Sequence, residues 1–254
     1  MKSLEFIAIE GIPLIKEGDN LVGVILLALE NNNISLNNND ILVIAQKVVS
    51  KSERRYAYLN EIDPSEKAIE LSKELDKDPR LVQLILNESN EVIRYRKGVI
   101  VVENKLGLIH ANAGIDRSNI ESEKDNPRVL LLPKDPDKSS LRIRKEIFNQ
   151  SNKDIGVIIN DSSGRAWRNG IVGIAIGSSG ADVLTDLRGK TDLFGNTLQV
   201  TEVGIADEIA SAASLLMGQG KEGLPVIIVK GFSKSTDKNG AKALIRKASE
   251  DLFR

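Results

Sequence analysis

The chain contains no cysteine and only one histidine, His110, among its 254 residues. The absence of cysteine excludes a disulfide framework, a zinc–thiolate site and an iron–sulfur cluster. A single histidine also excludes a histidine-rich transition-metal site within one chain. Any bound metal would therefore be held mostly by oxygen atoms, which favours Mg²⁺, Mn²⁺ or Ca²⁺.

A large net charge and long apolar runs are also absent. The formal net charge is -1 and the isoelectric point is near 6.0, so there is no global attraction to nucleic acid or to an anionic membrane. The longest apolar stretches fall far short of the roughly 20 residues that a membrane helix needs. Residues 1–15 alternate like a first strand and show no signal peptide. We expect a cytoplasmic protein with neither nucleic acid nor membrane as a partner.

Hydrophobic periodicity predicts a mixture of strands and helices. Asp63-Pro64 and Asp78-Pro79 each combine an acidic N-cap with proline at the first helical position. Two stretches, 91–110 and 171–200, hold strand pairs without a helix between them, which favours an α+β fold over a doubly wound sheet. We expect a single compact unit over residues 1–254, made of two interlocked lobes and unlike a P-loop or Rossmann fold. The predicted strands are 4–9, 41–49, 99–102, 129–132, 155–159, 171–176 and 225–229, and the predicted helices are 19–31, 64–75, 79–87, 139–149, 201–217 and 239–252.

The segment NDSSGRAWRNG, residues 160–170, combines an acid, hydroxyls, glycines, arginines and the only tryptophan. It follows the apolar run DIGVIIN, so Asp161 and Ser162 are expected to emerge at the carboxyl end of a strand, where ligands often bind. Oxygen donors beside Arg165 and Arg168 suggest a metal together with a phosphorylated or carboxylated ligand. The alternative is a turn in which the acid and the serine only satisfy backbone amides.

Another polar cluster, HANAGIDRSN at 110–119, contributes Asp116. Together with Asp161 it would form a pair of carboxylates, the minimum for one or two cations that bridge phosphates. Two such acids would need a cation between them, because like charges repel. Alone, Asp116 could equally be an N-cap or a turn acid.

Two further segments suggest phosphate binding without a standard motif. The segment MGQGKEG, 217–223, follows a predicted buried helix, and its glycines would let backbone amides and Lys221 face phosphate oxygens. The P-loop pattern is absent, and a plain helix-to-strand loop is the alternative. In AQKVVSKSE, 45–53, polar side chains interrupt a predicted strand, which fits either a protected edge strand or a strand facing a nucleotide.

Eight motifs, in order, extend over essentially the whole chain: GIPLIKEGDNL, ILVIAQKVVSKSE, KDPRLVQLILNES, HANAGIDRSN, LLPKDPDKSS, NDSSGRAWRNG, DLRGKTDLFGN and MGQGKEGLPV. Together they resemble the coenzyme F420-0:γ-glutamyl ligase family. The resemblance implies a GTP-dependent ligase that adds L-glutamate to the terminal carboxylate of F420-0 and then a further γ-linked glutamate, releasing GDP and phosphate. It also implies two divalent ions, Mg²⁺ or Mn²⁺, together with K⁺, an intertwined homodimer, and no fused nitroreductase-like domain.

The resemblance also assigns site residues. Asp116 and Asp161 would bind metal, with Ser162 and Gln219 on a second ion. The nucleotide contacts would be Gly11, Ile12, Pro13, Leu14, Gln46, Lys47, Lys51, Asn119, Met217, Gly218, Gln219, Gly220, Lys221, Glu222, Gly223 and Leu224.

The reaction chemistry suggests roles for the remaining polar residues. We expect the acceptor carboxylate to attack the γ-phosphate, forming an acyl phosphate from which the glutamate amine displaces phosphate. Arg165 and Arg168 are candidates to hold the acceptor's phosphate or carboxylate, with a surface or dimer salt bridge as the alternative. Trp167 could stack on the flat deazaflavin or lie in a core or interface. His110 is expected to be structural.

One departure from the family leaves the acceptor open. Relatives commonly read D-T-F-G-R-P-W-R where residues 161–168 read DSSGRAWR. Ser162 keeps the hydroxyl group, whereas Ser163 and Ala166 replace an aromatic residue and a proline. A ligase for another carboxylated acceptor, such as a folate-like compound, is therefore one alternative. A non-catalytic nucleotide-binding regulator is a second, which the pair of acids disfavours.

Overall fold

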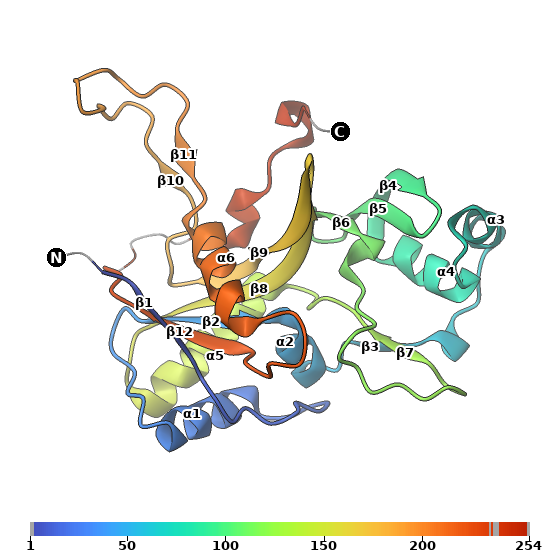
Figure 1. Cartoon of the computed structure of the whole chain (residues 1–254), viewed down its shortest axis with the longest axis horizontal. Helices are drawn as coiled ribbons and strands as arrows, with labels where there is room; N and C mark the ends of the chain where they lie inside the picture. The colour runs from blue at the N-terminus through green and yellow to red at the C-terminus, as the bar shows by residue number, and fades with distance from the viewer. Residues whose placement is uncertain (1–2, 234, 236–238, 253–254) are drawn as a thin grey trace.

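The computed structural model describes residues 3–233, 235 and 239–252, and its centre is a five-stranded mixed sheet (Figure 1). The strand order is β1-β12-β2-β8-β9. Only β2 and β8 run parallel to each other, and the other neighbours are antiparallel. The strands are β1 (Glu5–Ala8), β2 (Ile41–Ala45), β8 (Gly156–Arg165), β9 (Arg168–Ser179) and β12 (Val226–Lys230).

Helices cover both faces of this sheet, which explains why its central strands are continuously apolar. Alternate side chains of β2 enter opposite cores: Leu42 and Ile44 pack with the helices on one face, and Ile41 and Val43 pack with the helix on the other. Alanines at 206, 210 and 213 let the second-face helix lie close to the strands. The first face carries α1 (Leu21–Asn31), α2 (Gln46–Ser52) and α5 (Pro136–Ser151), and the second carries α6 (Ile205–Met217).

A second lobe is formed by residues between α2 and α5 and has its own core (Figure 1). Leu75, Ile85 and Ile100 are fully buried there. A strand pair, β3 with β7, connects this lobe to the main body. The elements of the lobe are β3 (Tyr56–Tyr58), η1 (Leu59–Glu61), α3 (Glu66–Leu75), α4 (Pro79–Asn87), β4 (Ser89–Arg96), β5 (Val99–Asn104), β6 (Ile109–Ala111), η2 (Asn112–Gly114) and β7 (Arg128–Leu130).

An arm projects away from the main body, beyond the short strands β10 (Thr185–Asp186) and β11 (Glu202–Val203) (Figure 1). Its apolar side chains face solvent: Leu193 is 99% exposed and Phe194 is 89% exposed. Among the described residues, no helix combines the length and the apolar character needed to span a bilayer.

The α+β prediction is confirmed, as is the helix capped by Asp78, whose carboxylate accepts a hydrogen bond from Arg80 N at 2.9 Å. The prediction for 41–49 is wrong in its second half, because the strand ends at Ala45 and helix α2 begins at Gln46. Asp63 is not a cap, since α3 begins at Glu66 and the Ser65 hydroxyl accepts from Ala68 N.

The expected C-terminal helix over 239–252 is also absent from the described residues. Two short 3-10 turns take its place, η3 (Ala241–Leu244) and η4 (Ala248–Glu250). The helix predicted for 139–149 begins earlier, at Pro136, with the Asp135 carboxylate as its N-cap. A proline at the first helical position preceded by an acid therefore marks α4 and α5 alike.

Candidate functional site

A cavity of about 410 Å³ lies at the edge of the main sheet where β2 and β8 meet α2. It joins five segments that are distant in the sequence: the loop after β1, helix α2, the loop between η2 and β7, strand β8 and the loop after α6. Its lining includes Ile12, Pro13, Leu14, Gln46, Lys47, Lys51, Asn119, Asp161, Ser162 and the residues from Met217 to Leu224.

The parallel pairing of β2 and β8 creates this pocket. Ala45 lies opposite Asn160 in the register, so Gln46 and Asp161 leave the pair at the same edge of the sheet. Parallel strands present their carboxyl ends together, where ligands bind in α/β-type layers. The chain after Ala45 turns into α2, which brings Gln46 and Lys47 over the end of β8.

Asp161 lies inside a strand, which corrects the expectation that the strand ends before it. β8 continues to Arg165, and Asp161 lies opposite Ile174 in the register with β9. Asp161 is only 8% exposed. Burial, aided by the charge of Asp116, raises the pKa of Asp161 to about 7, although Lys47 and the Ser162 amide act in the opposite direction.

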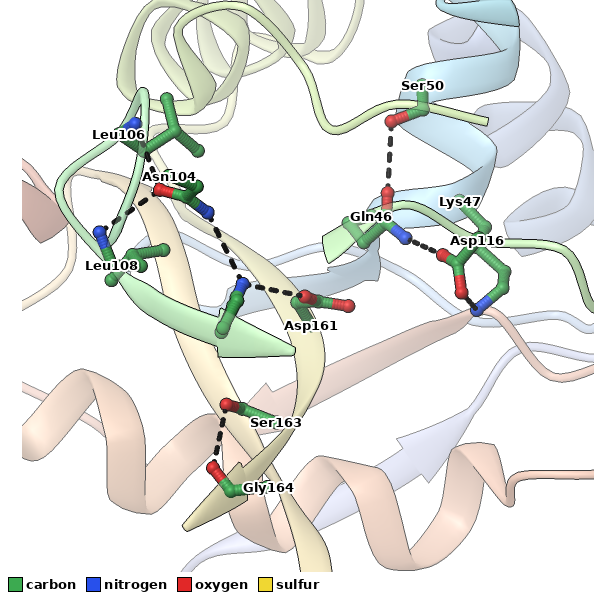
Figure 2. Close-up of polar contacts among 11 residues, drawn as sticks. Gln46, Lys47, Ser50, Asn104, Leu106, Leu108, Asp116, Asp161, Ser163 and Gly164 are labelled. Carbon is green, nitrogen blue, oxygen red and sulfur yellow. Dashed lines mark hydrogen bonds and ion pairs between the residues drawn. The ribbon is translucent and has the colours of Figure 1, made fainter. Parts of the chain in front are cut away.

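Asp116 is held by two neighbouring side chains of α2 (Figure 2). Lys47 Nζ lies 2.9 Å from Asp116 Oδ1, and Gln46 Nε2 donates a hydrogen bond to Asp116 Oδ2. Ser50 Oγ donates to Gln46 Oε1 at 3.0 Å, which fixes the amide with its nitrogen toward the acid. The backbone of Asp116 also bonds to Leu130 in both directions.

His110 lies next to Asp161 and is 5% exposed. Its Nδ1 is 4.0 Å from Asp161 Oδ2 and 3.4 Å from Asn104 Nδ2. Burial lowers the pKa of His110 to about 4, so the ring is neutral near pH 7. Asn104 Oδ1 accepts from the amides of Leu106 and Leu108, so its Nδ2 is the atom that faces the ring, while the other ring nitrogen, Nε2, is buried without a partner among the described residues. His110 does not line the pocket itself, and its structural role stays a prediction.

The loop from Met217 to Leu224 closes the other side of the pocket. Gly218 ends α6 with φ of +68°, and Gly220 N donates to Glu222 Oε2 at 2.8 Å. Asn119 Nδ2 donates to Gly220 O at 3.3 Å, and Lys51 Nζ donates to Asn119 O at 2.9 Å. Burial and then the neighbouring Lys47 lower the pKa of Lys51. The lysines therefore face the glycine-rich loop across the pocket.

The donor set fits hard divalent cations. Ser162 Oγ donates to Gln219 Oε1 at 3.0 Å, so these two oxygens lie together beside the buried Asp161. Within the part of the chain that the structure describes, no group of three or more histidine, cysteine, aspartate or glutamate side chains could hold a metal ion. Mg²⁺ is commonly held by one or two carboxylates while substrate phosphates and water complete its shell. Two acids, a hydroxyl and an amide oxygen suit that arrangement.

The two predicted arginines do not lie in the pocket. Arg165 and Arg168 stand at the exposed tip of the β8–β9 hairpin, and Arg165 Nη2 donates to Asn169 O at 3.4 Å. Trp167, between them, has φ of +64° and is 85% exposed, which excludes the core alternative for this residue. Gly11 and Asp116 do not line the pocket, although Asp116 contacts the lining residue Lys47, whereas Ile12, Pro13 and Leu14 do line it.

Asn160 and Ser118 line the pocket, although neither was assigned a role from the sequence. Asn160 is 4% exposed, and its Nδ2 donates to Ser214 Oγ at 3.0 Å and faces Met217 Sδ at 3.3 Å. It thereby ties β8 to the end of α6, while its Oδ1 is buried and has no hydrogen-bond partner among the residues that the structure describes. As the first polar residue after a buried apolar run, it was detectable from the sequence.

Comparison with known proteins gives consistent matches over the chain. A family model described as F420-0:Gamma-glutamyl ligase matches residues 11–231. A protein of Methanococcus maripaludis strain C6 is 50% identical over 219 residues, which cover 86% of each chain. One from Methanocaldococcus jannaschii is 43% identical over 253 residues, or 100% of this chain and 98% of the relative. One from Methanothermobacter thermautotrophicus is 40% identical over 253 residues, or 99% of each. All three are named Coenzyme F420:L-glutamate ligase.

Proposed function

Because the chain belongs to the F420-0:gamma-glutamyl ligase family, we propose that it is a GTP-dependent ligase that joins L-glutamate to the terminal carboxylate of F420-0. A further γ-linked glutamate is then added to the product. The observation that carries the proposal is one pocket, which we call the catalytic pocket, lined by Asp161, a glycine-rich loop and two lysines. Asp116 joins this site through its contact with Lys47, and its charge helps to raise the pKa of Asp161.

The pocket suits the phosphates of GTP. The glycine-rich loop after α6 offers backbone amides, and Lys47 and Lys51 offer positive charge on the opposite wall. Amides and ammonium groups on facing walls stabilise the phosphate oxygens of a nucleotide. The apolar side chains of Ile12, Pro13 and Leu14 border the same space and supply a surface for the base.

Asp116, Asp161, Ser162 and Gln219 are the residues that would hold two divalent cations, Mg²⁺ or Mn²⁺, with K⁺ as a further ion. When bound, these cations neutralise the phosphate charge that would otherwise repel the acceptor carboxylate. The protein supplies the oxygen ligands on rigid elements, because Asp161 lies within β8 and Asp116 is fixed to β7 through its backbone.

In the proposed reaction, a carboxylate oxygen of the acceptor attacks the γ-phosphorus of GTP, and the bond to the GDP oxygen breaks. The resulting acyl phosphate is attacked at its carbonyl carbon by the amine of glutamate. The bond from that carbon to the phosphate oxygen then breaks, phosphate leaves and the nitrogen loses a proton. The two lysines stabilise the transferred phosphoryl group by their charge, and the pocket walls keep the reactants in line.

The exposed hairpin tip and the arm fit recognition outside the pocket. Arg165 and Arg168 lie on the tip, where they can meet the phosphate or carboxylate groups of a large acceptor. The nearly fully exposed Leu193 and Phe194 support a homodimer in which a second copy covers the arm.

The direct test is incubation with GTP, L-glutamate and F420-0 followed by mass spectrometry. We expect products one and two glutamates heavier. Asp161→Asn should lower the rate by at least about a hundredfold, because charge stabilisation at the phosphoryl group is lost. The matched control is Asp63→Asn at an exposed acid of the second lobe.

The same assay distinguishes the alternatives. Glutamate added to a folate-like acceptor but not to F420-0 would replace the proposed acceptor. GTP bound without turnover of any acceptor would indicate a regulator instead. Normal ligation by a folded Asp161→Asn protein would show that the metal assignment is wrong.

A further inference from the structure

A second cavity, of about 280 Å³, lies where the core of the second lobe meets the core under the main sheet. We call it the seam cavity. Leu132 in its wall belongs to one core, and Ala113 belongs to the other. Ligand sites are common at such junctions between structural units.

Side chains separate the seam cavity from the catalytic pocket. Asn104 lines the seam cavity, and its Nδ2 lies 3.4 Å from His110 Nδ1. His110 in turn lies 4.0 Å from Asp161, which lines the catalytic pocket. Asn104 and His110 are 2% and 5% exposed, so they fill the space between the two cavities. A molecule in the seam cavity therefore does not reach the reacting phosphate.

The wall of the seam cavity carries a cation and an anion side by side. Arg55 Nη2 lies 3.3 Å from Glu88 Oε2, and Arg55 Nε donates to Leu132 O at 2.8 Å. These bonds leave N–H groups of the guanidinium and one oxygen of the carboxylate available. A neighbouring donor and acceptor of opposite charge complement the carboxylate and the ammonium group of an α-amino acid.

Two additional cations border the same cavity. Lys105 and Lys134 line it, are exposed, and form no ion pair with any residue in the described ranges. The cavity thus has more positive than negative charge, even though Glu88 is present. A ligand with a second carboxylate would neutralise this excess.

From this arrangement we propose that the seam cavity binds an acidic α-amino acid, as an effector site separate from the catalytic pocket. Arg55 and Glu88 hold the α-carboxylate and the α-ammonium, and the two lysines hold the side-chain carboxylate. The identification of this amino acid as L-glutamate rests on the proposed function, in which glutamate is consumed.

The test is calorimetric titration of L-glutamate into the full chain without nucleotide. We expect saturable binding that Lys105→Glu combined with Lys134→Glu weakens at least about tenfold, because both charged contacts to the carboxylate become repulsive. The control is Lys145→Glu, an exposed lysine on α5 outside the cavity. Thermal melting of each variant verifies that it is folded.

A second variant locates the bound molecule. Asp161→Asn lies in the catalytic pocket and should leave glutamate affinity within about twofold of the wild type. Absence of saturable binding by the wild type would overturn the proposal. Binding that is lost in Asp161→Asn and kept in the double lysine variant would overturn it too, because the glutamate would then occupy the catalytic pocket.

Ligand analogues test the assigned contacts. Glutarate lacks the amine and L-glutamine lacks the second charge, so each should bind at least about tenfold more weakly than L-glutamate. Equal affinity for glutarate or for inorganic phosphate would reduce the site to a general anion site and refute the amino-acid assignment. The titration contains neither GTP nor F420-0, so a failure of the proposed ligation would leave this result unaffected.

Discussion

Lys47 Nζ lies 2.9 Å from Asp116 Oδ1, so the chain itself supplies a cation to a carboxylate proposed to bind metal. The Gln46 side-chain amide donates a hydrogen bond to the other oxygen, Asp116 Oδ2. Both oxygens of Asp116 are thus occupied by neighbours on α2. Each carboxylate oxygen can accept more than one contact, so a metal ion that binds there competes chiefly with the positive charge of Lys47, and a displaced Lys47 is available for a phosphate.

Lys47→Met should therefore separate metal binding from nucleotide binding. We expect the affinity of the nucleotide-free protein for Mn²⁺ to rise about tenfold, since the competing charge is gone. The affinity for GTP should fall about tenfold, because a phosphate contact is lost. Titrations followed by electron paramagnetic resonance and by calorimetry measure the two constants.

The matched control is Lys51→Met. Lys51 donates to the backbone of Asn119 instead of to Asp116, so its loss should change Mn²⁺ affinity much less. Equal changes in the two variants would mean that the contact with Asp116 does not compete with metal.

Asp161 should make the stability of the metal-free protein depend on pH. Burial raises its pKa from 3.8 to about 7, so the folded state keeps a proton that the unfolded chain loses. The stabilisation that this proton gives to the folded state is complete below pH 3.8 and is lost as the pH rises through about 7. The slope is at most about 1.4 kcal/mol per pH unit.

Urea unfolding with a chelator, between about pH 4.5 and 7.5, measures this effect as the difference between the wild type and Asp161→Asn. His110 has the opposite sign: burial lowers its pKa from 6.5 to about 4, so its contribution is lost as the pH falls. Since both proteins contain His110, the difference isolates Asp161. Parallel curves would contradict the raised pKa.

Gly218→Ala should damage the glycine-rich loop. Gly218 has φ of +68°, and an added Cβ would overlap the Glu222 side chain. We expect the free energy of unfolding to fall by about 1–2 kcal/mol and the affinity for GTP to fall at least about tenfold. Gly220→Ala is the control, because its Cβ would come no closer than 3.4 Å to Glu222. If both variants bound GTP normally, the conformation of the loop would not matter to the nucleotide.

Arg165→Ala and Arg168→Ala should affect the acceptor alone. Both side chains lie at the hairpin tip and away from the catalytic pocket, so GTP affinity should stay within about twofold while the KM for F420-0 rises about tenfold. The control is Arg96→Ala, at an exposed arginine of the second lobe. A loss of GTP affinity in the tip variants would place these arginines in the nucleotide site after all.

Sequence patterns predicted best the elements whose ends depend on contacts within one helical turn. Asp78 with Pro79 marks a helix start correctly, because capping and a fixed φ act within one turn. Asp63 with Pro64 has the same pattern and fails, because the Ser65 hydroxyl is the better-placed acceptor for Ala68 N. In the run ILVIAQKVV, Gln46 and Lys47 interrupt the apolar residues where the strand ends and α2 begins, but a polar residue within a strand gives the same pattern, so the change to a helix was missed.

The site was predicted in its residue types more than in its geometry. Acids, glycines and lysines with no structural reason to cluster indicated phosphate chemistry, and Asp161, Ser162 and the 217–224 loop do line one pocket. Where the strand β8 ends depends on its pairing with β9 in a hairpin, and the polar, glycine-containing sequence of residues 160–170 does not indicate that both strands continue through it. That pairing carries Arg165 and Arg168 to an exposed tip, which no local pattern could indicate.

The position of β12 has a consequence for synthesis of the chain. This strand lies between β1 and β2, although both of them precede it in the chain and are synthesised first. Pro225 O accepts a hydrogen bond from Ala45 N at 2.8 Å, immediately before the helix that carries Gln46 and Lys47. The emerging protein therefore cannot complete the sheet between β1 and β2 until β12 has been synthesised. The pocket wall then closes as one of the last events of folding.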